Sequence, residues 1–150
     1  MRVATEIKLK AEADTLALGA RLASALRSGD VVRLSGDLGA GKTTLARGLI
    51  QSRLGEIDVP SPTYTLVQAY DWDTKENEGG ELWHCDLYRL ERPDDAYELG
   101  LMDAMGEEIM LIEWADKLGS LCPDDALRVD LRFDGKGRIA RLIGWEDRHV

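Results

Sequence analysis

The chain contains few cysteines, prolines and aromatic residues. Among its 150 residues are 2 cysteines, 4 prolines and 1 phenylalanine. Cys85 and Cys122 stand apart from each other and from any CxxC motif or histidine spacing suited to zinc, which argues against a disulfide framework and a cysteine-based zinc site. We therefore interpret both cysteines as small core residues of a protein in a reducing compartment.

Long apolar runs and clusters of basic residues are also missing. No apolar run approaches the roughly 18 residues of a membrane-spanning helix, and residues 1–6 are too charged to begin a signal peptide. The 28 acidic residues outnumber the 19 basic ones, for a formal net charge of −9. Because counterion release requires clustered Lys and Arg, this balance argues against a protein that grips nucleic acid or anionic lipid by its general field. We expect a soluble, cytoplasmic protein without membrane contact, in which any RNA is held by something else.

The chain does contain the phosphate-binding pattern G-x-x-x-x-G-K-[ST], at residues 36–43. An apolar run at residues 31–34 predicts a strand before it, and residues 44–53 predict a helix after it. Glycines allow backbone N–H groups to close around phosphate oxygens, and the positive end of the helix dipole adds to the attraction. An ordinary glycine turn that caps a helix is the alternative.

Two side chains of this loop are expected to have distinct roles. Lys42 is expected to reach the β- and γ-phosphates, and the Thr43 hydroxyl to ligate Mg²⁺. The loop residues that we expect to bind nucleotide are Gly36, Gly39, Ala40, Gly41, Lys42 and Thr43.

The apolar periodicity predicts a single α/β domain over residues 1–150. Strand candidates lie at residues 3–9, 31–34, 64–72, 81–86, 109–113, 127–134 and 139–145. Helix candidates lie at residues 14–28, 44–53, 93–105 and 115–121, the first of them stopped by Gly29. The first strand alternates charged and apolar residues, as edge strands do, and the strands at 64–72 and 81–86 are expected to form an antiparallel hairpin. We therefore predict a P-loop NTPase fold, with a mixed parallel and antiparallel sheet flanked by helices.

Acids at the ends of two strands are candidates for a metal site. The apolar run at residues 109–112 ends at Glu113, and ligands gather at the C-terminal ends of strands in such sheets. Glu113 is therefore expected in the Mg²⁺ shell, either directly or through a water. A solvated acid at a strand end is the alternative.

Asp86 and Thr63 are candidates for placing the attacking water. Asp86 can orient a water or support the ion, or it can be a structural residue before a turn. Thr63 can offer a hydroxyl to the metal or a phosphate, although a turn that leads into a strand is the simpler interpretation of residues 61–64. His84 alone is interpreted as a core or surface group.

Four segments in this order and spacing resemble the bacterial TsaE family, also called YjeE: residues 36–44, 61–67, 84–90 and 112–114. The likeness spans roughly residues 14–114. It implies a P-loop fold with a mixed sheet and slow hydrolysis of ATP. It also implies action with the TsaB and TsaD proteins, which place threonylcarbamoyl on adenosine 37 of tRNAs that read ANN codons. Contact with tRNA is then indirect, through that complex.

The resemblance also implies roles by position. They are Lys42, Thr43 and Thr44 on phosphate and Mg²⁺, Glu113 at the metal, Asp86 in hydrolysis, Trp114 beside the nucleotide and Thr15 near the base. Two departures concern local packing: Cys85 stands where the family usually has Phe, and residues 115–116 replace a common Pro-Glu or Ser-Glu. The part after Leu121 matches no motif of the family.

A small-molecule P-loop kinase is the alternative enzyme. Such kinases usually close an arginine-rich lid over the phosphates, whereas the arginines from Arg89 onward are scattered here. A third possibility is a nucleotide-gated binding module whose hydrolysis only resets a complex, and this interpretation overlaps with the family resemblance.

Overall fold

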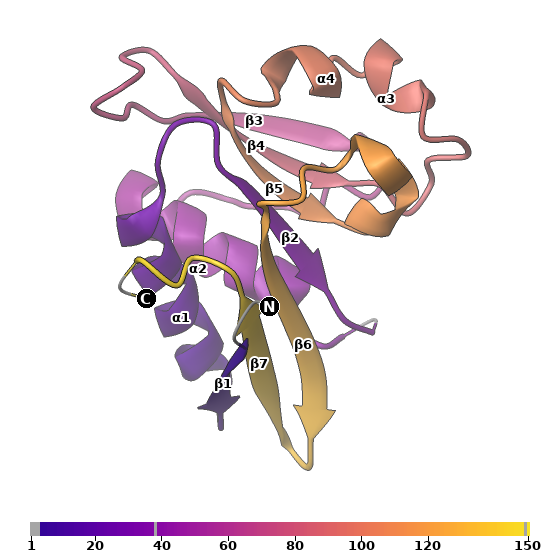
Figure 1. Cartoon of the computed structure of the whole chain (residues 1–150). Coiled ribbons are helices and arrows are strands. Elements are labelled where there is room, and N and C mark those ends of the chain that lie inside the picture. The colour runs from indigo at the N-terminus through magenta and orange to yellow at the C-terminus, as the bar shows by residue number, and fades with distance from the viewer. Residues whose placement is uncertain (1–3, 38, 149) are drawn as a thin grey trace. The chain divides into compact units, whose positions relative to one another are not determined.

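The computed structural model describes residues 4–37, 39–148 and 150, in two compact units (Figure 1). The first unit comprises Met1–Leu26, Leu34–Ser61 and Leu127–Val150, and the second comprises Arg27–Arg33 and Pro62–Ala126. The strands are hydrogen-bonded in the order β1-β7-β6-β2-β5-β4-β3, and β2 (Val31–Ser35) is divided between the two units. The fold is therefore of the α/β class with a mixed sheet, as the sequence predicts.

In the first unit, three strands pair antiparallel. β1 (Ala4–Leu9) pairs with β7 (Gly137–Ile143), and β7 pairs with β6 (Leu127–Asp134) through a tight hairpin. β1 is an edge strand with exposed charged side chains and a buried Leu9, which confirms that prediction, although Val3 lies outside the described residues. Edge strands of this type discourage pairing with other chains.

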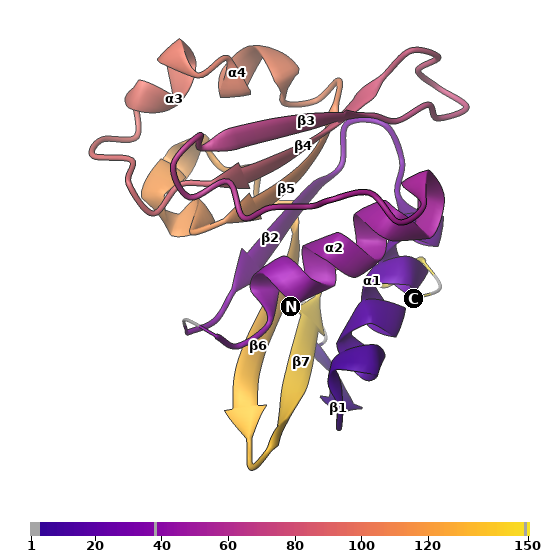
Figure 2. The same cartoon turned by 180° about the vertical axis from the view of Figure 1, so that it is seen from behind.

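Two helices, α1 (Glu12–Ala25) and α2 (Lys42–Leu54), lie side by side in the same unit (Figure 2). The helix predicted over residues 14–28 is shifted toward the N-terminus. It begins early because the Asp14 carboxylate accepts the Ala11 N–H at 3.0 Å and so caps the first turn. It ends before Gly29 because Leu26 is already extended, with ψ 140°.

Glycines at the crossing of α1 and α2 allow their backbones to touch. A Cβ on Gly19 would lie 2.7 Å from the Leu49 nitrogen, and one on Gly48 would lie 2.7 Å from the Leu16 Cα. Both distances are too short for real Cβ contacts, so neither position has room for a methyl group without movement of backbone. This crossing fixes the helix that begins at the phosphate loop.

In the second unit, β3 (Val67–Asp71) and β4 (Glu81–Asp86) form the predicted antiparallel hairpin. β4 also pairs parallel with β5 (Ile109–Glu113), in register from Leu82↔Ile109 to Asp86↔Glu113. Every residue of β5 is buried, as expected of a parallel strand covered on both faces. The two acids therefore end neighbouring strands at the same level.

Two predicted elements of this unit are different in the structure. The helix expected over residues 93–105 is split into α3 (Asp95–Glu98) and α4 (Leu101–Ala104), because Gly100 between them takes a left-handed conformation with φ 78°. The strand expected over residues 64–72 begins only at Val67, since Leu66 has φ 66° and its N–H donates to the Pro62 carbonyl at 2.7 Å.

The short helix predicted over residues 115–121 is the 3-10 helix η1 (Ala115–Leu121), kinked at Gly119. The apolar core of this unit includes both predicted core residues, Cys85 and Cys122. Across the described residues, no helix is long and apolar enough to cross a membrane.

Candidate functional site

The predicted phosphate loop lies in the first unit, between β2 and α2. Its glycines have positive φ: 144° at Gly36, 81° at Gly39 and 109° at Gly41. Such torsions turn successive backbone N–H groups toward one side, as phosphate cradles require. The first turn of α2 has no acidic residue, so its positive end is not neutralised from within the helix. Leu38 of the loop lies outside the described residues.

Gly36 has a second constraint besides its torsion. A Cβ at this position would clash with the Leu131 carbonyl of β6. The loop therefore starts with backbone packed on backbone, which leaves no freedom for a larger residue.

Lys42 is the buried cation of the loop. Only 6% of it is exposed, and its ammonium donates to the Gly36 carbonyl and, at 3.3 Å, to the Asp37 carbonyl. The lysine therefore lies within the curve of the loop rather than in solvent. Thr43 and Thr44, the next two residues of α2, are half-buried.

A pocket of about 260 Å³ adjoins the loop in the same unit. Its lining includes Gly39, Gly41 and Thr44, with Thr15 from α1. Thr15 is nearly fully buried, and its methyl group would be 3.7 Å from a Cβ on Gly41. The structure therefore brings Thr15 to the phosphate loop, about 25 residues away in sequence.

Arg138 also lines this pocket, although no sequence motif indicates a role for it. Its guanidinium donates to the Gly39 carbonyl at 3.1 Å and stacks on the Phe133 ring at 4.2 Å from the centroid. The strands predicted at residues 127–134 and 139–145 suggest a hairpin without indicating what the hairpin contacts.

The predicted acids lie in the second unit, at the paired ends of β4 and β5. Asp86 is 5% exposed and Glu113 is 3% exposed. The chain after Asp86 remains paired, because the Leu87 N–H donates to the Glu113 carbonyl at 3.0 Å. The backbones that carry both carboxylates are therefore held by strand pairing.

Asp86 is held by two neighbours through its side chain. Oδ1 accepts the Tyr88 N–H at 3.0 Å, and Oδ2 accepts the Thr63 hydroxyl at 3.2 Å. The first contact is an Asx turn, which is compatible with the structural role considered for Asp86 and leaves its other oxygen to Thr63. The second brings Thr63 and Asp86 together, the two candidates between which the sequence could not choose.

His84 lies behind these acids on β4. Its Nε2 is 2.7 Å from Oε2 of Glu113, and the imidazole is completely buried. Of the two positions expected for His84, core or surface, the structure shows the core position. The sequence did not predict its contact with Glu113. Only the β4–β5 register, which pairs Asp86 with Glu113, reveals it.

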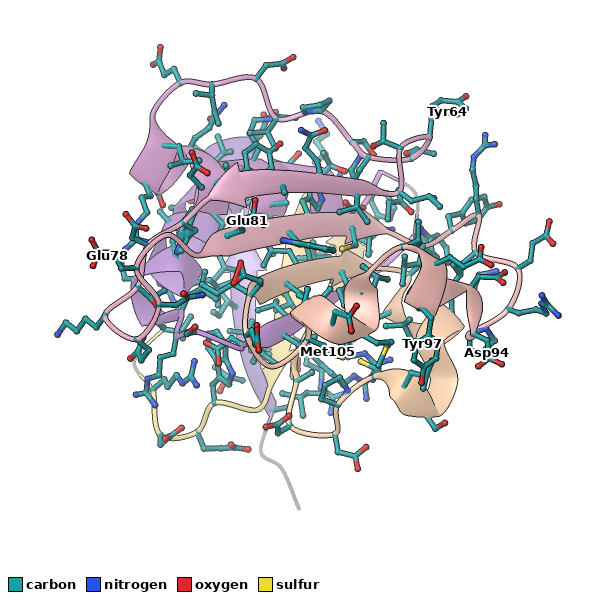
Figure 3. The ribbon with its side chains drawn as sticks, turned by 90° about the horizontal axis from the view of Figure 1, so that it is seen from above. Tyr64, Glu78, Glu81, Asp94, Tyr97 and Met105 are labelled. Atoms are coloured by element: carbon teal, nitrogen blue, oxygen red, sulfur yellow. The ribbon has the colours of Figure 1, made fainter. Side chains whose placement is uncertain are left out.

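Aromatic and basic side chains surround the end of β5. Trp114 has φ 61°, an uncommon torsion for a bulky residue, and its ring lies 5.0 Å from that of Tyr88. Tyr64 is 81% exposed and extends outward from the segment before β3 (Figure 3), with the Arg89 guanidinium 4.4 Å from its ring centroid. The structure thus brings Trp114 to Tyr88, within the second unit.

Burial changes the acidity of the two cysteine thiols of this unit. Desolvation raises the pKa of the Cys85 thiol far above its ordinary value, and burial also raises the pKa of Cys122. Neither thiol is therefore a nucleophile at neutral pH. Within the part of the chain that the structure describes, no three His, Cys, Asp or Glu side chains are grouped so as to hold a metal by themselves.

Comparisons with known proteins concern nearly the whole chain. The family model for "Threonylcarbamoyl adenosine biosynthesis protein TsaE" matches residues 9–142. The tRNA threonylcarbamoyladenosine biosynthesis protein TsaE of Haemophilus influenzae is 40% identical over 114 residues, or 75% of this chain and 69% of that protein. The protein of that name from Rickettsia conorii is 36% identical over 137 residues, or 90% of this chain and 75% of that protein.

One solved structure supports the fold. The crystal structure of YdiB from Bacillus subtilis matches with a TM-score of 0.74, covering 98% of this chain and 89% of its own. At 24% identity, that protein is similar to this chain in fold.

Proposed function

Because the chain belongs to the TsaE family of threonylcarbamoyl adenosine biosynthesis proteins, we propose that it is a Mg²⁺-dependent P-loop ATPase. Its turnover of ATP would serve the formation of N6-threonylcarbamoyladenosine at adenosine 37 of tRNAs that read ANN codons. Family membership supports the pathway, and the residues of the chain support the nucleotide chemistry.

The observation that carries the proposal is the phosphate loop at the start of α2. Three glycines with positive φ, a helix of 13 residues without acids in its first turn, and the buried Lys42 make a site for polyphosphate. A nucleotide would replace the carbonyl oxygens of Gly36 and Asp37 as the partner of the ammonium. Thr44 would contact phosphate from the same turn.

Mg²⁺ fits this donor set as an ion that arrives with its nucleotide. The described residues provide no three-ligand cage, and magnesium is usually bound by one or two carboxylates together with phosphates and waters. Thr43 and Glu113 are the residues that we propose to hold it, Glu113 directly or through a water. The ion would neutralise charge on the phosphates.

Asp86 and Thr63 are proposed to orient the attacking water. Their 3.2 Å contact makes them one hydrogen-bonded unit, so a water bound to either is oriented by both. Trp114 is proposed to lie beside the nucleotide. The attacking water would thus be oriented by a pair of side chains of which Asp86 is itself held by the Tyr88 N–H.

Proteins of the TsaB and TsaD type are the proposed partners, and tRNA is reached only through their complex. The net charge of −9 supports this indirect contact, because a protein that holds RNA alone needs a basic surface. The complex would act in the cytoplasm.

The purified chain tests the proposal when it is incubated with ATP labelled on the γ-phosphate, with and without Mg²⁺. We expect slow, magnesium-dependent release of inorganic phosphate, at a rate that changes when TsaB- and TsaD-type partners are added. Transfer of the label to a small molecule from cell extract would instead identify a small-molecule kinase. Absence of both binding and hydrolysis would refute both.

A further inference from the structure

The most completely buried polar contact of the second unit joins His84 and Glu113. The imidazole is 0% exposed and Glu113 is 3% exposed, and their closest atoms are 2.7 Å apart. Two strands contribute one residue each, and the parallel register of β4 and β5 sets the distance between them. The contact is therefore built by the sheet rather than by flexible loops.

The side chains of β4 alternate between its two faces, so His84 and Asp86 share a face. Glu113 is in register with Asp86, and its carboxylate reaches back to the imidazole two residues earlier on β4. On one face of β4, His84 therefore contacts the Glu113 carboxylate, and Asp86 lies in register with Glu113.

The second ring nitrogen of His84 indicates which atom carries the proton. Nδ1 has no hydrogen-bond partner among the described residues, and it is buried. A proton on Nδ1 would leave a buried donor unsatisfied, whereas a proton on Nε2 is accepted by the Glu113 carboxylate oxygen 2.7 Å away. A proton on Nε2 therefore gives Glu113 a hydrogen-bond donor. His84 is then the donor and Glu113 the acceptor.

We propose that His84 is a positioning residue, which donates its Nε2–H to Oε2 of Glu113 and fixes the orientation of that carboxylate for Mg²⁺. The inference rests on the proposed function, because Glu113 is a metal ligand only there. Outer-shell hydrogen bonds of this type hold a carboxylate ligand in one rotamer, and their removal typically weakens metal affinity or activity about 10- to 100-fold. His84 itself need not touch nucleotide, metal or water.

Three substitutions test the role. His84→Leu has a similar volume and no donor, His84→Gln keeps an N–H donor with comparable reach, and His84→Asn has a donor that is too short. For His84→Leu and His84→Asn, we expect the Mg²⁺ concentration for half-maximal ATPase activity to rise about 10- to 100-fold. His84→Gln should restore a nearly normal requirement. Binding of ATP in the presence of EDTA should be unchanged in all three.

A control separates positioning from loss of stability. Leu82→Ala alters a fully buried residue of the same strand and face, so it should lower the melting temperature without changing the Mg²⁺ requirement. If His84→Leu does not fold, the comparison of His84→Gln with His84→Asn still decides the question, because both retain a polar amide.

A double-mutant cycle identifies the residue through which His84 acts. In a Glu113→Ala background, where both the carboxylate and its hydrogen bond to His84 are already lost, His84→Leu should have little further effect on turnover. Full and additive effects, or a normal Mg²⁺ profile in both His84→Leu and His84→Asn, would overturn the positioning role. Failure of the wild-type chain to bind or hydrolyse ATP would instead refute the proposed function itself.

Discussion

The phosphate loop and the strand-end acids hold their polar groups by different means. In the loop, three glycines with positive φ bend the main chain, and the buried Lys42 supplies a positive charge within the curve. At the strand ends, Thr63, Asp86 and Glu113 come from separate segments, and each is held by another side chain or by a backbone N–H. One site is made by local torsions, and the other by the register of two strands.

This difference indicates how each site responds to change. A loop built from backbone keeps its shape when one side chain is removed, so its substitutions affect binding more than folding. In a network of buried side chains, a substitution leaves the neighbouring polar group without its hydrogen-bond partner. Substitutions there therefore affect folding and function together. The following substitutions separate the two cases.

The largest effect is expected from Lys42→Ala in the loop. Loss of the ammonium removes charged hydrogen bonds to phosphate worth about 3 kcal/mol, which is roughly a 100-fold loss of ATP affinity. Isothermal titration with ATP measures the change, and Lys8→Ala on the exposed side of β1 is the control. An affinity equal to that of the control would mean that the loop does not bind the triphosphate.

The next effect concerns Glu113, for which two substitutions should differ. Glu113→Gln retains an oxygen that accepts the His84 Nε2–H, so its free energy of unfolding should remain near that of the wild type. It should still raise the Mg²⁺ requirement, because the negative charge of the carboxylate is lost. Glu113→Ala removes the acceptor too, and an unsatisfied buried donor costs about 1–3 kcal/mol. Urea denaturation and Mg²⁺ titration of both variants provide the comparison. Equal stability of the two variants would contradict the buried hydrogen bond.

A smaller loss of stability is expected when the support of the loop is altered at Gly48. An added methyl group would press on the backbone of α1, and overpacking of this type costs about 1–3 kcal/mol, offset by up to about 1 kcal/mol of helix propensity. Gly48→Ala should therefore unfold at a lower urea concentration than Arg21→Ala, an exposed change on α1. An unchanged midpoint would show that the helices have room to separate.

The smallest effect concerns Cys85, next to His84 on β4. Burial raises the pKa of this thiol above its ordinary value of 9.0, so the folded chain retains the proton after the unfolded chain has lost it. Stability is therefore constant below about pH 9 and falls above it, by at most about 1.4 kcal/mol per pH unit for this thiol. Urea unfolding at alkaline pH should show a shallower fall in Cys85→Ala. Parallel curves for the two proteins would exclude the thiol as the cause.

The sequence predicts what is local and misses what depends on long-range pairing. The loop is recognised because its glycines, lysine and threonine are consecutive, and Glu113 is recognised because the apolar strand before it ends there. The partner of Glu113 depends on the β4–β5 register, and no local pattern encodes that register. Arg138 was missed for the same reason, since its contact with Gly39 joins segments 99 residues apart.

Breaks within elements were also difficult to predict. Pro93 and the acids after it are typical of a helix start, and they led to one long helix over residues 93–105. Gly100 interrupts it, although a single glycine is often tolerated within a helix. In the folded chain, a Cβ on Gly100 would lie 3.6 Å from the Trp83 ring. The sequence gives no indication of this contact.

The left-handed torsion of Trp114 has a consequence for how the strand before it is aligned. A slip of β5 by one residue would exchange the two faces of that strand and bring Ile112 or Trp114 opposite Asp86 in place of Glu113. In such a misaligned chain, Nε2 of His84 would lose its partner Glu113, and the left-handed torsion of Trp114 would fall at a different level of the sheet. The correct alignment is therefore favoured by the hydrogen bond that His84 gives to Glu113, immediately before the residue at which the chain turns out of the strand.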